Sequence, residues 1–274
     1  MSAEASTSQQ NPIWASGEAY EPFIGRWSRL VAREFVAWLA IATGRRWLDV
    51  GCGTGGLSQT ILTILTTSAP TEIKAIDRSE GFIAYARQKI DDERISFQVG
   101  DAQALPLDDA SYDVAVSGLV LNFVPQPDRM VAEMLRCVKS AGTVALYVWD
   151  YAGKMELLRY FFDSVIALNP ADIEHDEGRR FPICQPDALA ALFRDAGLQN
   201  IEARAIDVPT HFRDFDDYWS PFLGGQGVAP VYVVSLSEGE RARLREHLRA
   251  KLPVASDGSI HLVARAWAIK GTRK

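Results

Sequence analysis

The sequence predicts one doubly wound α/β domain, in which helices cover both faces of a mainly parallel sheet. Three observations support this fold class: apolar strands alternate with amphipathic helices from residue 26 to residue 149, the strands are near-continuous apolar runs, and a glycine-rich turn follows the first strand. Near-continuous apolar runs are typical of parallel strands buried on both faces. With 274 residues, 47% of them hydrophobic, the chain can fill a large core without disulfides or metal ions.

The elements before residue 149 alternate in type. Apolar residues recur at three- and four-residue spacing from Arg26, which predicts a helix that ends near Gly44. An apolar strand at 47–50 runs into the glycine turn, and helical spacing resumes at Leu57. The elements predicted next are a strand at 72–77, a helix at 79–90, strands at 95–99 and 112–117, a helix at 129–138 and a strand at 143–149.

Beyond residue 149 the alternation loosens, and the stretch at 209–256 is too long to be a plain connection. Ser237 and Glu240 have the spacing of a capping box, which predicts the start of a helix in that stretch. The other predicted elements are helices at 155–168 and 186–196 and strands at 201–206 and 260–269. The predicted organisation is a disordered tail at 1–12 and a single domain at 13–274, with an N-terminal helix at 13–44, a cofactor-binding core at 45–149, helical cap insertions at 150–185 and 209–256, and the C-terminal part of the sheet at 186–208 and 257–274.

Composition excludes several classes of protein. The net charge of −6, with 23% charged residues, offers no basic surface to nucleic acid. No apolar run approaches the roughly 18 residues of a membrane span, and the first residues lack a secretion signal, so we expect a cytoplasmic protein. Cys52, Cys137 and Cys184 are odd in number and form no CxxC pair, so the sequence predicts neither a disulfide framework nor a metal site.

The glycine turn stands where an open parallel sheet usually binds its ligand. Gly51, Gly53 and Gly56 match the GxGxxG dinucleotide pattern, and Asp77 follows Gly56 by 21 residues, near the spacing of an acid that binds a ribose hydroxyl. An NAD(P)-dependent oxidoreductase is therefore one interpretation. A nucleoside triphosphate loop is excluded because Leu57 occupies the place of its lysine.

Acidic residues near the turn favour a different ligand. Asp49 precedes Gly51 by two residues and would repel a pyrophosphate, whereas it would attract an ammonium or sulfonium group. Asp77 and Asp101 follow the next two predicted strands. Three acids at one edge of the sheet therefore predict a ligand with cationic character.

Four motifs in order resemble the class I S-adenosylmethionine-dependent methyltransferases. They are Asp-Val-Gly-Cys-Gly-Thr-Gly at 49–55, Asp77 after the second strand, Gly-Asp-Ala at 100–102 and Tyr-Asp-Val-Ala-Val-Ser at 112–117. The resemblance covers about 47–149 and extends more weakly to residue 269, and the chain is most similar to small-molecule enzymes grouped with the quinone-biosynthesis methyltransferases. It implies a Rossmann-like sheet of seven strands that ends in a two-strand hairpin.

The resemblance also implies the cofactor, S-adenosylmethionine, with S-adenosylhomocysteine as product, and the residues that bind it. Asp49 would anchor the ammonium group, Asp77 the ribose hydroxyls, and Arg26 the carboxylate. The glycines would let the backbone approach the cofactor, and Asp101 with Ala102 would contact the adenine edge. The full implied set is Tyr20, Arg26, Asp49, Gly51, Gly53, Gly55, Asp77, Arg78, Asp101, Ala102, Ser117 and Leu119.

The expected reaction is in-line methyl transfer to a small, uncharged or hydrophobic acceptor, for which alignment matters more than a metal ion. His211, Asp150 and Tyr218 are candidate general bases because they follow strand ends or lie in the cap. Many relatives carry histidines after the fourth strand, where this chain has Asn122 and Phe123. A second alternative is a catalytically silent protein that binds the cofactor.

Overall fold

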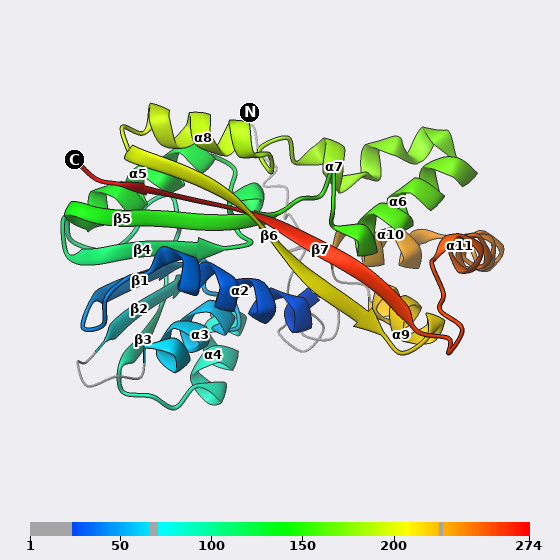
Figure 1. The fold of residues 1–274 in the computed structure, drawn as a ribbon, viewed down its shortest axis with the longest axis horizontal. Helices are drawn as coiled ribbons and strands as arrows, with labels where there is room; N and C mark the ends of the chain where they lie inside the picture. The colour runs from blue at the N-terminus through cyan, green and yellow to red at the C-terminus, as the bar shows by residue number, and fades with distance from the viewer. Residues whose placement is uncertain (1–23, 66–70, 225–226) are drawn as a thin grey trace, which may run out of the picture.

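The computed structural model describes residues 24–65, 71–224 and 227–274. Its seven strands form one sheet in the order β3-β2-β1-β4-β5-β7-β6 (Figure 1). The first five strands are parallel to one another, and β7 lies antiparallel between β5 and β6. The predicted doubly wound α/β class is confirmed. The predicted tail at 1–12 and Tyr20 lie outside the described residues.

The strand bounds show where the sheet changes direction. Strand order reverses between β1 and β4, so the loops after these two strands diverge and leave a crevice at their carboxyl ends. The strands are β1 (Arg46–Val50), β2 (Glu72–Asp77), β3 (Ile95–Val99), β4 (Tyr112–Gly118), β5 (Val138–Trp149), β6 (Gln199–Phe212) and β7 (Ile260–Thr272).

Helices cover both faces of the sheet. Trp38 lies over the ammonium group of Lys270 on β7, whereas Phe193 lies against the next residue, Gly271. Because successive strand residues face opposite sides, the helices that carry Trp38 and Phe193 cover opposite faces. These are α2 (Arg26–Leu39) and α8 (Pro186–Asp195), with α3 (Gly56–Ile64) beside α2 and α5 (Pro127–Cys137) beside α8. A further helix, α4 (Glu80–Lys89), packs against β2 and β3.

Several predicted boundaries were wrong, among them the start of β5, which lies at Val138 and not at residue 143. Helix α2 ends at Leu39 and not near Gly44, because Ala40 adopts a left-handed conformation with φ of 51°. Strand β6 continues through Phe212, so residues 209–212, predicted to lie in the second cap insertion, belong to the sheet. Pro209 lies within β6, which is the edge strand of the sheet and tolerates a residue that lacks an N–H group.

The cap is helical, as predicted, and it lies beyond the carboxyl ends of the parallel strands (Figure 1). Phe161 and Phe222 stack at 4.6 Å between ring centroids, which joins the two cap insertions. The predicted capping box of Ser237 and Glu240 is present. The cap elements are α6 (Glu156–Leu168), α7 (Glu177–Arg180), α9 (Phe215–Trp219), α10 (Val228–Ser235) and α11 (Glu238–Lys251), with short 3₁₀ turns between them.

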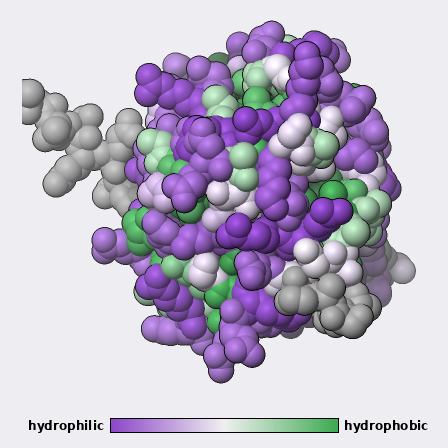
Figure 2. All heavy atoms as spheres, turned by 90° about the vertical axis from the view of Figure 1, so that its left-hand side faces the viewer, coloured by the Kyte–Doolittle hydropathy of each residue, from purple (hydrophilic) through white to green (hydrophobic). Residues whose placement is uncertain are grey.

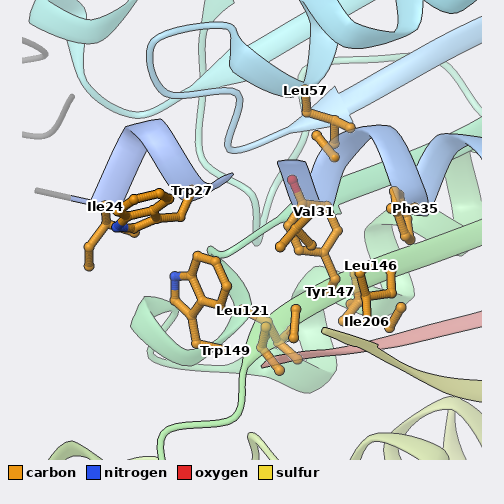
Figure 3. Packing of buried hydrophobic residues seen from close by; sticks show 14 of the residues in the cluster. Ile24, Trp27, Val31, Phe35, Leu57, Leu121, Leu146, Tyr147, Trp149 and Ile206 are labelled. Carbon is orange, nitrogen blue, oxygen red and sulfur yellow. The ribbon is translucent and has the colours of Figure 1, made fainter. Parts of the chain in front are cut away.

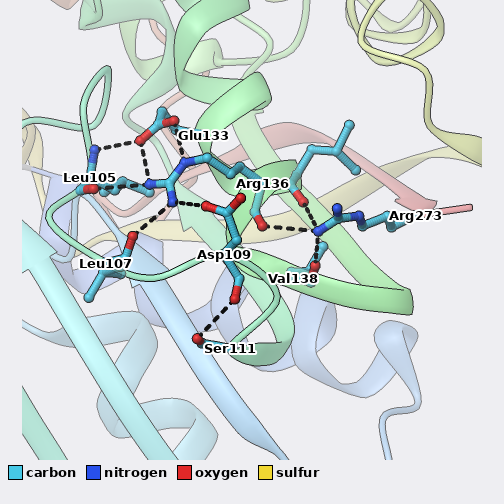
Figure 4. A network of polar contacts seen from close by, with 9 residues as sticks. Leu105, Leu107, Asp109, Ser111, Glu133, Arg136, Val138 and Arg273 are labelled. Atoms are coloured by element: carbon cyan, nitrogen blue, oxygen red, sulfur yellow. Dashed lines mark hydrogen bonds and ion pairs between the residues drawn. The ribbon is translucent and has the colours of Figure 1, made fainter.

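Arg136 of α5 fastens the long loop between β3 and β4 (Figure 4). Its guanidinium donates to the carbonyl oxygens of Leu107 and Leu105 at 2.8 and 3.0 Å, and it also pairs with Asp109 and Glu133. Glu133 in turn accepts from the backbone N–H of Leu105 at 2.7 Å. The loop that begins with Asp101 is therefore held against α5 by the side chains of Arg136 and Glu133.

The one face of the molecule that Figure 2 shows is mainly polar. The face shown in Figure 2 carries mainly hydrophilic side chains, with hydrophobic ones scattered between them. Within the described ranges, no helix is both long enough and apolar enough to cross a membrane.

Candidate functional site

A cavity of about 650 Å³ opens at the carboxyl ends of the parallel strands. It runs across the ends of β1 to β5, with the reversal of strand order between β1 and β4 near its middle. Its lining residues come from the loops after all five strands, from the start of α2 and from α7. The three predicted acids, Asp49, Asp77 and Asp101, all line it.

The glycine turn forms the floor of the cavity. Gly51 has a φ of +75°, and its N–H donates to the carbonyl oxygen of Ile76 on β2 at 2.7 Å. A Cβ atom at Gly51 would lie 2.6 Å from both methyl carbons of Val120. Positive φ and close packing therefore require glycine at this position.

Asp49 supplies a buried carboxylate oxygen without a partner. The residue is 1% exposed; its Oδ2 accepts from the Ser58 hydroxyl at 2.6 Å, whereas no described residue donates to its Oδ1. The pKa of Asp49 is raised to about 7, mainly by burial; the Ser58 hydrogen bond lowers it, and the nearby Asp77 carboxylate raises it. An ionised Asp49 has no cationic partner within the described part of the chain, which favours a cationic ligand.

Asp77 ends β2 and braces the turn. Its Oδ2 accepts from the N–H of Gly53 at 2.9 Å, and its Oδ1 accepts from the N–H of Ser79 at 2.8 Å. Burial raises the pKa of the Asp77 carboxyl, and these two backbone hydrogen bonds limit the rise. Each oxygen keeps a lone pair that can accept from a ligand hydroxyl.

Asp101 lies at the far end of the cavity and is exposed. Its Oδ1 accepts from the backbone N–H of Gln103 at 2.9 Å, which closes a tight turn directly after β3. The Gln103 side-chain oxygen then accepts from the N–H of Gln126 at 3.0 Å, so this turn is tied to the start of α5.

The structure brings most of the predicted cofactor-site residues together, but not all of them. Gly55 packs its α-carbon toward Ile90 of the α4 region, and Ser117 donates its hydroxyl to the carbonyl oxygen of Val50, so both support the walls. Arg26 pairs with Asp217 of α9 at 3.3 Å and stacks on Phe212. The predicted residues that line the cavity are Asp49, Gly51, Gly53, Asp77, Arg78, Asp101, Ala102 and Leu119.

The three candidate general bases do not line the cavity. Tyr218 is fully buried and donates its hydroxyl to the carbonyl oxygen of Leu157 at 2.9 Å, and burial raises the pKa of this phenol well above its usual range. Asp150 accepts from the backbone N–H of Lys154 at 3.0 Å, which closes the turn after β5. His211 lies on β6 beside its cross-strand neighbour His261. Cap packing and turn formation account for the positions of Tyr218 and Asp150.

Sequence reasoning offered Tyr151 as a residue of an apolar acceptor pocket, but it missed the rest of the aromatic end of the cavity. Trp149 and Tyr147 of β5, Tyr151 after it, and Phe123 after β4 all line the space, as does Arg180 of α7. Strand β5 is apolar throughout its last residues, so no alternation marks which side chains face the cavity. Arg180 and the aromatic rings come from segments far apart in the sequence, and only the fold brings them to one cavity.

Comparison with known proteins finds a matching family model and several similar proteins. Residues 48–146 match the family model described as a methyltransferase domain. The demethylmenaquinone methyltransferase of Bacillus subtilis is 29% identical over 177 residues, which cover 59% of this chain and 74% of that protein. The biotin biosynthesis bifunctional protein BioHC of Teredinibacter turnerae is 34% identical over 111 residues, which cover 38% of this chain and only 20% of that protein.

A solved structure shares the fold. Phosphoethanolamine N-methyltransferase 2 of Haemonchus contortus, determined with phosphomonomethylethanolamine and S-adenosylhomocysteine, superposes with a TM-score of 0.57 at 15% identity. The superposition covers 93% of this chain and 56% of that one. At this identity the likeness shows the seven-stranded architecture.

Proposed function

We propose that this chain, a class I S-adenosylmethionine-dependent methyltransferase similar to the demethylmenaquinone enzymes, methylates a small molecule with a largely apolar body. The observation that carries the proposal is the unpartnered carboxylate oxygen of Asp49 on the floor of the cavity. A buried carboxylate oxygen without a donor costs free energy, and a cationic ligand group offsets that cost.

The residues of the cavity fit S-adenosylmethionine. Asp49 would accept from its ammonium group, and Asp77 from its ribose hydroxyls, since each carboxylate keeps free lone pairs. Gly51 and Gly53 would let the backbone approach without a Cβ in the way. The further assignments are Arg78, Asp101 and Ala102 to the adenine and Leu119 to the methionine chain. Arg26, Gly55 and Ser117 stay predictions without a place on the cavity wall, and Tyr20, which is outside the described residues, also stays a prediction.

The chain contributes mainly alignment to the proposed reaction. When bound, the cofactor supplies a methyl group on a sulfonium sulfur; the acceptor atom donates the electron pair of the new bond, and sulfur keeps the pair of the old one. Leu119 and Val120 would exclude water from the middle of the cavity, and the rings of Phe123 and Trp149 would orient the acceptor. Holding two reactants in line is worth about 7 to 11 kcal/mol of the barrier. Because none of the candidate bases lines the cavity, we assign no proton transfer to them.

The two alternatives are less well supported. A dinucleotide would place its pyrophosphate beside the glycine turn, close to the buried Asp49 and Asp77 carboxyls, where like charges repel. A silent cofactor-binding protein would bind S-adenosylhomocysteine as well as an enzyme does. Turnover with labelled S-adenosylmethionine against a panel of acceptors separates that alternative from a methyltransferase.

Asp77→Ala tests the cofactor assignment. We expect calorimetry to show that S-adenosylhomocysteine binds the parent at micromolar concentration and binds the variant about 1 to 3 kcal/mol more weakly, because ribose hydroxyls lose a buried acceptor. Asp195→Ala, which removes an exposed acid from α8, is the matched control and should leave the affinity unchanged. The proposal is wrong if the parent does not bind S-adenosylhomocysteine or if it binds NADH instead.

A further inference from the structure

The end of the cavity over β4 and β5 differs in chemistry from the end over β2 and β3. Asp77 and Asp101 line the end over β2 and β3, whereas the rings of Phe123, Trp149 and Tyr151 line the end over β4 and β5. Two rings of this end meet on Phe181: its centroid lies 5.3 Å from that of Phe123 and 5.3 Å from that of Tyr151. If the acids hold the cofactor, the aromatic end is the place left for the acceptor. Flat aromatic walls favour a planar guest.

Trp149 offers this end a hydrogen-bond donor. The residue is 1% exposed and lines the cavity, and its indole nitrogen makes no hydrogen bond to any residue within 24–65, 71–224 or 227–274. Figure 3 shows the nitrogen-bearing edge of Trp149 turned to the side where Ile24 and Trp27 lie, and Ile24 also lines the cavity. An indole N–H can only donate, so it would pair with an acceptor atom on a guest that reaches it.

Arg180 adds a positive charge at the same end. Its guanidinium carbon lies 5.8 Å from the ring centroid of Phe181, and in the part of the chain that the structure describes it forms no ion pair and no hydrogen bond. The nearest acid on its own helix is Glu177. Burial raises the pKa of Glu177 to about 8, which favours its neutral form, while the charge of Arg180 acts in the opposite direction. The other cation of the cavity, Arg78, follows β2 at the opposite end.

We propose that the acceptor is an aromatic acid, whose carboxylate pairs with Arg180 while its ring lies among Phe123, Trp149 and Tyr151. This inference rests on the proposed function and replaces our expectation of an uncharged acceptor. A guanidinium binds a carboxylate with two parallel hydrogen bonds, which fixes orientation as well as position. The ring supplies the apolar body that the aromatic walls require.

The test compares aromatic acids with their uncharged amides. Benzoate, 4-hydroxybenzoate and 2-naphthoate are each titrated beside the corresponding carboxamide into the protein saturated with S-adenosylhomocysteine, by calorimetry. The parent should bind the carboxylates roughly five- to twentyfold more tightly than the carboxamides, a range reduced from that of buried pairs because Arg180 is exposed. Arg180→Gln should lower this preference to about one, and Arg180→Lys should restore part of it.

Arg179→Gln is the matched control. Arg179 precedes Arg180 on the same helix but lines a separate surface hollow with Arg159 and Asp163, so its loss should leave the preference intact. The affinity for S-adenosylhomocysteine, measured first and by itself, should be the same in all four proteins, which shows that they are folded.

The outcomes separate the two proposals. Equal affinity for carboxylate and carboxamide, a preference that survives Arg180→Gln, or no binding of any carboxylate at millimolar concentration overturns the aromatic acid and leaves methyl transfer untouched. Failure of the parent to bind S-adenosylhomocysteine overturns the proposed function instead.

Discussion

Burial and ligand binding make opposite demands on Asp49. The folded protein raises the pKa of this carboxyl from 3.8 to about 7, so folding stabilises its neutral form. An ammonium group requires the ionised form, which the free protein disfavours. The ionised form of Asp49 therefore carries an unfavourable desolvation energy, which the charge of a cationic ligand offsets.

Asp49→Asn should raise stability and lower affinity at the same time. A folded pKa above the unfolded one contributes stability that is full below about pH 4 and is lost as the pH rises through about 7. Above that pH the ligand-free variant should therefore exceed the parent in free energy of unfolding by up to about 4 kcal/mol, since one pKa unit corresponds to about 1.4 kcal/mol. Urea denaturation at low and high pH measures the difference. Glu177, which is also buried with a raised pKa, is present in both proteins and cancels.

The affinities of the parent and of Asp49→Asn for S-adenosylhomocysteine provide a complementary test. The parent should bind S-adenosylhomocysteine about tenfold more tightly at about pH 8 than at about pH 6, because Asp49 must release its proton first. The variant should bind more weakly and lose this dependence. A parent whose affinity is flat across this range would show that Asp49 does not contact the ligand ammonium.

At the scale of elements, the glycine turn joins β1 to α3 by backbone geometry. Gly51, Gly53 and Gly55 all have positive φ angles, but only Gly51 and Gly55 are tightly enclosed by neighbouring side chains. Gly53 has no atom within 4 Å of the position of a Cβ. Two of these glycines therefore serve packing as well as conformation, while the third leaves open space.

Substitutions by alanine should separate these roles. Gly51→Ala combines left-handed strain with a contact of 2.6 Å to Val120 and should cost about 2 to 3 kcal/mol of unfolding free energy. Gly53→Ala adds only the strain and should cost about 1 kcal/mol. Gly239→Ala, in the open on α11, should be neutral or stabilising by about 0.5 to 1 kcal/mol, since alanine is the better helix former. Equal losses at Gly51 and Gly53 would contradict the packing argument.

At the scale of the whole molecule, distant segments share polar anchors. The guanidinium of Arg273, near the end of the chain, donates to the carbonyl oxygens of Leu135, Arg136 and Val138, where α5 ends and β5 begins (Figure 4). Arg136 holds the loop that starts at Asp101. Hydrogen bonds of Arg273 and Arg136 therefore link β7, helix α5 and the loop that forms one wall of the cavity.

Arg136→Gln should weaken both the fold and the site. The variant loses most of the contacts to the Leu105 and Leu107 carbonyls and to two carboxylates, and we expect a loss of about 2 kcal/mol in unfolding free energy, with a smaller loss of S-adenosylhomocysteine affinity. Thermal unfolding and calorimetry measure the two. Arg194→Gln, at an exposed position of α8, should change neither by more than about 0.5 kcal/mol. A stability unchanged by Arg136→Gln would show that the loop is held by its backbone alone.

Local signals predicted the order of elements and the floor of the cavity. Strands β2 and β3 were predicted with the bounds that the structure gives them, and the capping box of Ser237 was found from spacing alone. Hydrophobic period, caps and turn glycines act over a few residues, so they can be read without the fold. The same holds for the three acids, because the carboxyl ends of parallel strands meet at one edge whatever the details of packing.

The cavity wall opposite those acids depends on contacts that no local pattern encodes. Tyr218 was a candidate general base but fills the cap core, and β6 pairs with β7 beyond the predicted strand end at residue 206. Trp149 and Arg180 are 31 positions apart in the sequence, and they line the same cavity because β5 and α7 both reach it. Sequence periodicity thus specifies the parallel core and the acidic end of the cavity, which suits a cationic ligand. The choice of acceptor depends on how the cap packs over the sheet, and long-range contacts decide that packing.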